Sequence, residues 1–219
     1  MIAYNLEQIK NELPSGVKLV AVSKFHPIEA IREAYLEGQR AFGENRPQEF
    51  AAKAVQLPQD IEWHFIGHLQ TNKLKLVLPY ASLVESIDSL HLLEAVNAWG
   101  EKNTKTISIL LEVHIGAEDT KQGFSVSEIY SVLDAAGSFP FVDFRGLMGM
   151  ASHTDEEAAV RGDFALIKTL FDDCREKYQG LVGFNVLSIG MSGDWKIALD
   201  YGSTEVRIGT AIFGERCYI

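Results

Sequence analysis

The sequence predicts an α/β fold: a single (β/α)8 TIM barrel with one extra helix at its N-terminus. Short apolar runs alternate with longer amphipathic segments eight times in the 219-residue chain. No linker rich in Gly, Ser or Pro interrupts the series, and no change in composition separates two domains, so residues 1–219 are expected to form one domain. The turn after the first apolar run, Ser-Lys-Phe-His-Pro, lacks the glycines that an open dinucleotide-binding sheet usually carries there.

The extra helix is expected at 2–13, where apolar residues recur at helical spacing before Pro14. Asp88 stands where it would cap the fourth helix of the series. The expected strand–helix pairs are 18–22 with 27–36, 41–42 with 47–55, 61–65 with 71–77, 83–86 with 88–99, 106–113 with 126–136, 141–148 with 155–178, 185–188 with 194–200, and 205–207 with a final turn at 209–213.

Composition and charge exclude several classes of protein. The net charge is −10 and no basic run appears, so we expect no nucleic-acid partner. No apolar stretch approaches the roughly 18 residues of a membrane span, and the acidic, amphipathic start does not resemble a signal peptide. Cys174 and Cys217 form no CxxC pair, which fits a reducing compartment. The expected location is the cytoplasm, with no membrane partner.

In a βα barrel, the reactive side chains lie at the carboxyl ends of the strands. The first expected strand is followed by Ser23 and Lys24. A lysine at the end of an inward apolar strand is partly desolvated, which favours a neutral amine able to form a Schiff base with a carbonyl. The alternative is a lysine whose ammonium extends along its apolar stem into water.

The loops after the seventh and eighth expected strands read Ser188-Ile-Gly-Met-Ser-Gly-Asp194 and Arg207-Ile-Gly-Thr210. Both combine small residues, hydroxyls and a helix start, which supply the backbone N–H groups and positive dipole that a phosphate needs. Taken singly, each loop is equally well read as an ordinary capped turn. Together, and opposite a strand-end lysine, they indicate a phosphorylated aldehyde, and pyridoxal 5′-phosphate (PLP) is the first candidate.

Other polar residues near strand ends are less specific. Asn45 either hydrogen-bonds a ring substituent of a cofactor or serves as a turn residue. His64 is expected to pack in the core rather than to act as a base. His64 and His68 do not share a helix face, and His114 and His153 stand singly, so no metal site is predicted.

Arg207, at the end of the eighth expected strand, has two readings. It points into the barrel mouth, or it pairs with Glu205 or Glu215 on the rim. If it met the pyridine nitrogen of PLP, its permanent charge would disfavour protonation of that nitrogen and weaken the ring as an electron sink.

Six segments of the chain resemble the motifs of one protein family. They are Val20-Ala-Val-Ser-Lys24, Phe42-Gly-Glu-Asn45, Trp63-His-Phe-Ile-Gly-His-Leu-Gln-Thr-Asn-Lys73, Gly146-Leu-Met148, Ser188-Ile-Gly-Met-Ser-Gly-Asp194 and Tyr201-Gly-Ser-Thr-Glu-Val-Arg-Ile-Gly-Thr-Ala-Ile-Phe-Gly214. The family is that of the pyridoxal phosphate homeostasis proteins, and the resemblance covers nearly the whole chain.

The resemblance implies a PLP-binding barrel similar to the N-terminal domain of bacterial alanine racemase. It implies that Lys24 forms the Schiff base, that Arg207 faces the pyridine nitrogen and that Asn45 lies near the ring. The residues implied to hold the phosphate are Ser192, Gly193, Gly209 and Thr210. The family regulates the supply of free PLP and of amino and keto acids, so PLP-dependent apo-enzymes are implied as possible partners.

Three functions are compatible with this reading. The first is a PLP carrier that takes part in intracellular PLP homeostasis without efficient turnover, with no catalytic residue assigned. The alternative is a PLP-dependent amino-acid racemase or another enzyme that processes amino acids slowly. The third is a phosphate-binding barrel enzyme without PLP, in which Lys24 acts as a base or Schiff-base lysine.

Racemisation by two bases needs a proton-transfer group on each face of the cofactor. In alanine racemase the second base is a tyrosine that an additional β-domain contributes across a dimer. This sequence ends at Ile219, shortly after the eighth expected strand, so neither that tyrosine nor an obvious dimerisation element is expected. The expected protein is therefore a monomer with an open cofactor face.

Overall fold

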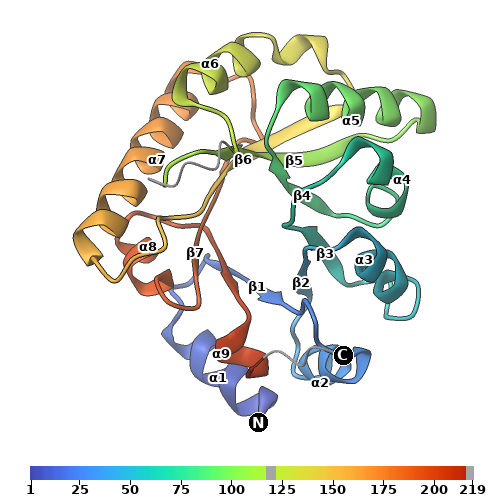
Figure 1. The fold of residues 1–219 in the computed structure, drawn as a ribbon, viewed down its shortest axis with the longest axis vertical. Coiled ribbons are helices and arrows are strands. Elements are labelled where there is room, and N and C mark those ends of the chain that lie inside the picture. The colour runs from blue at the N-terminus through green and yellow to red at the C-terminus, as the bar shows by residue number, and fades with distance from the viewer. Residues whose placement is uncertain (117–121, 216–219) are drawn as a thin grey trace.

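The computed structural model describes residues 1–116 and 122–215 and contains a closed barrel of eight parallel strands. Each strand pairs with the next in sequence, and β1 (Lys18–Val22) closes the ring by pairing with β8 (Glu205–Ile208). Figure 1 shows the strands in the middle of the molecule and the helices around them. The predicted (β/α)8 barrel is confirmed.

The remaining strands are β2 (Ala41–Glu44), β3 (Glu62–Phe65), β4 (Leu83–Ile87), β5 (Ile107–Val113), β6 (Val142–Gly149) and β7 (Val186–Met191). The helices are α1 (Ile2–Glu12), α2 (Ile28–Leu36), α3 (Pro47–Ala54), α4 (Leu74–Val77), α5 (Leu90–Asn103), α6 (Val126–Asp134), α7 (Glu157–Lys177), α8 (Trp195–Asp200) and α9 (Thr210–Phe213). Short 3-10 turns cover Thr71–Lys73 and Ala136–Ser138. Among the helices in the described ranges, none has the length and apolar character that crossing a bilayer requires.

The extra N-terminal helix is also confirmed, as α1. Its buried residues Leu6 and Ile9 join the main hydrophobic core, and the Asn5 side-chain amide donates to the Ile212 carbonyl at 2.9 Å. This contact joins α1 to α9, and the two helices lie beside each other in Figure 1. The first and last helices therefore lie together outside the strands that close the barrel.

The predicted cap of α5 is wrong. The N-cap is Ser89, whose hydroxyl accepts a hydrogen bond from the Leu92 backbone N–H at 3.4 Å. Asp88 lies one residue too early, because β4 extends to Ile87. Its carboxylate is held by the Ser89 hydroxyl and the His68 ring, each at 3.0 Å.

Two apolar clusters pack on opposite sides of the barrel wall. The larger lies between strands and helices, where alternate strand residues such as Leu19, Ala21 and Ile109 meet the helices. The smaller, Leu83, Leu110 and Met148, belongs to the inside of the barrel. Branched apolar side chains usually fill that interior. Here much of it is polar and charged, and the buried residues concerned are His64, Glu85, Ser188, Glu205 and Arg207.

We predict that Gly146→Ala destabilises the protein by at least about 2 kcal/mol. Gly146 follows a register shift between β5 and β6, and a Cβ there would lie 1.8 Å from the Val186 carbonyl oxygen, so the β6–β7 pairing must open. Gly162→Ala is the matched control, because Gly162 is an exposed residue within α7 with open space around it. It should stabilise the helix by up to about 1 kcal/mol. Urea unfolding midpoints measure both effects, and equal midpoints for the two variants would contradict this account.

Candidate functional site

The turn that carries Lys24 directly follows β1 and is fixed on both sides. The Ser23 hydroxyl donates to Glu44 Oε1 at 2.6 Å, and the Phe25 backbone N–H donates to Glu49 Oε1 at 2.9 Å. Phe25 has φ of +66°, a left-handed conformation that is uncommon for a large side chain and typical of functional turns. Lys24 is half-buried between these two anchored residues. Its backbone therefore has little freedom at the barrel mouth.

A buried lysine, Lys53 of α3, connects the anchors of this turn. Its ammonium lies 2.7 Å from Glu44 Oε1, 2.6 Å from Glu49 Oε1 and 2.9 Å from the Ser23 carbonyl oxygen, and the residue is only 5% exposed. Burial raises the pKa of Glu44, and the Lys53 charge offsets part of that rise. This cluster was not predicted from the sequence, although the i,i+4 spacing of Glu49 and Lys53 in a helix is a visible signal.

The loop after β7 presents Ser192 and Gly193 at an exposed position. Gly190 has φ of +97°, and a Cβ there would lie 2.7 Å from the Ala198 Cβ, so only glycine allows α8 to pack this closely. Asp194 Oδ1 accepts from the Met191 backbone N–H at 2.5 Å and closes the loop.

The loop after β8 lies against both of these regions. The Gly209 backbone N–H donates to the Ser192 hydroxyl at 3.2 Å, which joins the two predicted phosphate loops. A Cβ on Gly209 would lie 3.0 Å from the Val22 carbonyl oxygen, at the end of the strand that leads to Lys24. Thr210, the first residue of α9, is exposed beside it. The structure thus brings Ser192, Gly209 and Thr210 together next to the Lys24 strand.

Arg207 lies inside the barrel and is 4% exposed. One guanidinium nitrogen donates to the Ser188 carbonyl at 2.8 Å and to the Ser188 hydroxyl at 2.5 Å, and the other donates to the Gly149 carbonyl at 2.9 Å. Glu85 Oε2 lies 3.6 Å away. The alternative in which Arg207 pairs with a carboxylate on the exposed rim is wrong, because these partners hold it between β4, β6 and β7.

Asn45 follows β2 at the same end of the barrel as Lys24. Its Oδ1 is buried and has no hydrogen-bond partner among the described residues. The backbones of Gly67 and Asn45 pack so closely that a Cβ at Gly67 would lie 2.2 Å from the Asn45 carbonyl oxygen. A buried amide oxygen without a partner is unfavourable, so the residue is suited to a ligand that donates a hydrogen bond.

His64 is buried, as predicted, but its surroundings are charged. Its Nδ1 lies 2.8 Å from Glu85 Oε1 and 3.5 Å from Glu205 Oε1. Burial alone would lower the pKa of His64, yet Glu205 and Glu85 outweigh it and raise that pKa to about 10. His68 instead lies at the mouth beside Asp88, so the two histidines do not form one site. The structure groups His64 with Glu85 and Glu205, within 4.8 Å of one another, and the spacing of these residues in the sequence gave no sign of it.

Glu112 of β5 is a further buried group that was not predicted from the sequence. It is 3% exposed, and its Oε2 has no hydrogen-bond partner within the described part of the chain. Burial and the charge of Asp88 raise the pKa of Glu112 to about 7. It lines a cavity of about 280 Å³ together with His114 and His153, which the sequence analysis had regarded as isolated. Period-two alternation with Leu110 was the available signal that it faces inward.

Residues 1–217 match the protein family described as the N-terminal domain of alanine racemase. Several proteins that carry the name pyridoxal phosphate homeostasis protein are similar over most of this chain. The one from Vibrio alginolyticus is 37% identical and covers 97% of this chain and 92% of its own length. The one from Mus musculus is 40% identical and covers 92% of this chain and 77% of its own length.

Solved structures agree with these matches. PipY of Synechococcus elongatus PCC7942 with PLP bound has a TM-score of 0.90 and 34% identity, over 98% of this chain and 100% of that one. The same protein without PLP has a TM-score of 0.92 and 35% identity, with the same coverage. Alanine racemase of Clostridium difficile 630 is 16% identical with a TM-score of 0.81 over 98% of this chain and 59% of its own, a similarity of fold.

We predict that Lys53→Met destabilises the protein by about 3–5 kcal/mol, because Glu44 then stays buried without its cation. Chemical denaturation measures the loss. The double variant Glu44→Gln/Lys53→Met should recover part of it, since the fully buried carboxylate is then neutral and only the partly exposed Glu49 has lost its cation. Lys75→Met, at an exposed position of α4, is the control and should change stability by less than about 0.5 kcal/mol. A loss of similar size in both single variants would contradict the role of the Lys53 cluster.

We predict that the free energy of unfolding falls as the pH rises, because Glu112 loses its proton in the unfolded chain before it does so in the folded protein. The folded protein retains the Glu112 proton up to a pKa of about 7, whereas the unfolded chain releases it near 4.5. The stabilising contribution is therefore complete below about pH 4.5 and disappears as the pH approaches 7. Relative to wild type, Glu112→Gln should gain up to about 3 kcal/mol in free energy of unfolding between pH 5 and pH 7. Exposed Glu101→Gln should show no such trend, and a constant difference for Glu112→Gln would refute the prediction.

Proposed function

The chain belongs to the pyridoxal phosphate homeostasis protein family, and on that basis we propose that it binds PLP at the barrel mouth and takes part in PLP homeostasis. One observation supports this most strongly. The pairing of β1 with β8 brings the fixed Lys24 turn beside the segment of Gly209 and Thr210. The Gly209 backbone N–H is in turn hydrogen-bonded to the Ser192 hydroxyl. An amine and a set of groups suited to bind a phosphate thus lie at the same end of the barrel.

The residues present fit the cofactor. Asn45 offers a buried oxygen that lacks a donor among the described residues, which suits a polar substituent of the pyridine ring. Ser192 and Thr210 carry exposed hydroxyls, and Gly193 is exposed with open space where a side chain would be. The backbone N–H of the half-buried Gly209 donates to Ser192, a bond that a phosphate can replace. We propose that these last four residues bind the phosphate. The acidic chain thereby binds an anion through oriented local dipoles rather than through net positive charge.

We propose that Lys24 holds the cofactor through a Schiff base. The amine nitrogen adds to the aldehyde carbon, and loss of one water molecule leaves a carbon–nitrogen double bond. Addition of water reverses the reaction and releases PLP intact. The anchored neighbours Ser23 and Phe25 keep the lysine backbone in place, so binding requires little ordering of the chain.

We propose that the Arg207 guanidinium meets the pyridine nitrogen. When bound, PLP supplies an electron sink for carbanion chemistry, and this sink is strongest with a protonated ring. The charge on Arg207 disfavours that protonation. Such a site retains PLP without promoting efficient turnover, as a carrier requires.

We extend the proposal to the whole chain. Residues 1–219 form a single PLP-binding domain, which acts as a monomer in the cytoplasm and exchanges PLP with PLP-dependent apo-enzymes. The buried free thiol of Cys174 is compatible with that reducing compartment.

One observation favours the alternative, slow processing of amino acids. Glu112 lies on β5, four strands from β1 in a closed ring of eight, and is therefore on the opposite side of the barrel from Lys24. Its pKa of about 7 suits a group that exchanges protons near neutral pH. Deuterium incorporation at Cα of L-alanine, followed by NMR, tests this second function. Incorporation that depends on both PLP and Glu112 would support it.

We predict that wild-type protein with PLP shows the visible absorbance band of a Schiff base between PLP and a lysine. Borohydride reduction should then fix the cofactor on the peptide that contains Lys24. Lys24→Ala should lose the reduced adduct and bind PLP at least about tenfold more weakly, because the covalent bond is absent. Lys75→Ala, at an exposed position of α4, is the matched control. An adduct that maps to another lysine, or protein that stays colourless with added PLP, would overturn the proposed function.

A further inference from the structure

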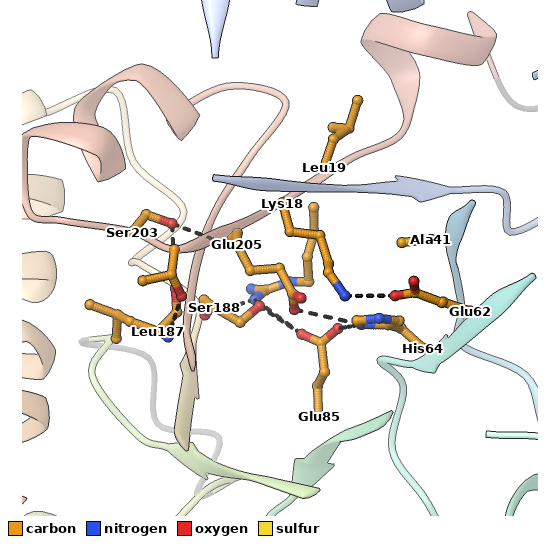
Figure 2. A network of polar contacts seen from close by, with 12 residues as sticks. Lys18, Leu19, Ala41, Glu62, His64, Glu85, Leu187, Ser188, Ser203 and Glu205 are labelled. Atoms are coloured by element: carbon orange, nitrogen blue, oxygen red, sulfur yellow. Dashed lines mark hydrogen bonds and ion pairs between the residues drawn. The ribbon is translucent and has the colours of Figure 1, made fainter. Parts of the chain in front are cut away.

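A chain of polar contacts crosses the inside of the barrel. His64 of β3 contacts Glu85 of β4 at 2.8 Å, and the second oxygen of Glu85 accepts from the Ser188 hydroxyl at 2.7 Å. Ser188, on β7, in turn accepts from Arg207 at 2.5 Å. Figure 2 shows His64, Glu85 and Ser188 directed toward one another, with Glu205 beside the histidine.

Every member of this chain is almost completely buried. The relative exposures are 1% for His64, 0% for Glu85 and Ser188, 2% for Glu205 and 4% for Arg207. Buried charges are stable only when they are paired and hydrogen-bonded. Burial and the charge of Glu85 raise the pKa of Glu205, and His64 offsets part of that rise. The two carboxyl groups can therefore be ionised together only with positive charge nearby, and a His64 imidazolium together with the Arg207 guanidinium supplies it. A divalent metal ion in place of the histidine proton would leave an excess positive charge beside Arg207.

The two charged groups in direct contact with His64 favour its protonated form, and the cations near it are each paired with a carboxylate. Glu85 and Glu205 contact it directly, and Arg207 lies on the far side of Glu85, at 3.6 Å from that carboxylate. At the amino-terminal end of the barrel, Lys18 pairs with Glu62 at 2.6 Å, so these two charges largely cancel. Lys18, Glu62 and His64 line a cavity at this end of the barrel, and Arg145 lines it too. Arg145 pairs with Asp143 at 3.4 Å.

Arg207 depends on this chain for its orientation. Its hydrogen bonds to Gly149 and to the Ser188 carbonyl go to neutral acceptors. The negative charge that attracts the guanidinium comes from Glu85, at 3.6 Å, and also from Glu112 of β5 when that group is ionised. The two oxygens of Glu85 are divided between His64 and Ser188. These two contacts fix the orientation of the Glu85 carboxylate. Because the Ser188 hydroxyl donates its hydrogen to Glu85, its oxygen is left to accept the hydrogen bond from Arg207.

We propose that Glu85 and Ser188 are positioning residues for the cofactor: with the His64 imidazolium, they fix the Arg207 guanidinium for its contact with the pyridine ring. This inference rests on the proposed function. It adds that the interior of the barrel, and not only its loops, determines how firmly PLP is held.

The first experiment measures His64 in protein without PLP. NMR of the imidazole nitrogens over a pH series should show a doubly protonated ring that titrates well above neutral pH. Glu85→Gln and Glu205→Gln should each lower the titration midpoint by about one unit or more, since each removes a facing carboxylate. A wild-type midpoint near 6.5 would refute the imidazolium, whether or not the protein binds PLP.

The second experiment compares the same two variants after loading with PLP. Both remove a carboxylate from His64, but only Glu85 also contacts Ser188 and faces Arg207. At pH 7, Glu85→Gln should release PLP about tenfold faster, the size expected when a hydrogen bond to a charged group is lost. Glu205→Gln should release PLP at the wild-type rate within about twofold. The rate of PLP release is measured as the rate at which PLP is transferred to an excess of an apo-enzyme that requires it.

Ser188→Ala provides an independent variant if Glu85→Gln does not fold, and it should also accelerate release and alter the absorbance spectrum of bound PLP. Loss of the His64 proton at high pH should accelerate the release of PLP. In Glu205→Gln this acceleration should begin at a lower pH than in wild type, in step with the lower His64 midpoint measured by NMR. Equal release rates for Glu85→Gln and Glu205→Gln, or an unchanged rate and spectrum in Ser188→Ala, would overturn the proposal. Failure of wild-type protein to take up PLP would instead overturn the proposed function.

Discussion

The pairing of β1 with β8 is the contact on which the rest of the structure depends. Its register joins Lys18 to Glu205 and Val20 to Arg207. Residues almost 190 positions apart in the sequence become neighbours through backbone hydrogen bonds alone. Because all eight strands run parallel, their carboxyl ends meet on one face, and the turns after β1, β7 and β8 converge there. Closure of the barrel and assembly of the candidate site are therefore the same event.

Closure also confines charge inside the barrel, and this charge has to be neutralised locally. Outside the barrel wall, Lys53 pairs with Glu44 and anchors the Lys24 turn. Inside it, His64 and Arg207 compensate Glu85 and Glu205. Apolar residues of similar volume would often stabilise a core as well or better. What the charged groups add is direction, because a hydrogen-bonded guanidinium or carboxylate has few orientations open to it.

Local sequence patterns predicted the fold and the end of the barrel at which the candidate residues lie, whereas the binding of PLP by these residues stays a prediction. Strand 18–22 agrees with the observed β1, and the predicted phosphate residues Ser192, Gly209 and Thr210 lie together because strand ends alone determine their side of the barrel. The contacts between strands were not predictable in this way. Ser188 and Glu85 are 103 residues apart, and no local period shows that their side chains meet. The predicted cap of α5 was wrong for a smaller reason, since β4 is one residue longer than predicted and the N-cap is Ser89.

The two sides of the proposed site differ in how they are built, and this difference suits reversible binding. The groups assigned to the phosphate lie on the loops after β7 and β8 and at the start of α9. There Ser192 and Gly209 already satisfy each other at 3.2 Å and can exchange that bond for contacts to a ligand at little cost. Arg207 and the Lys24 turn are instead held by buried partners that do not need to move. A rigid base lowers the entropic cost of binding. An open rim leaves a path for release, so a protein built in this way holds its cofactor in a defined place without enclosing it.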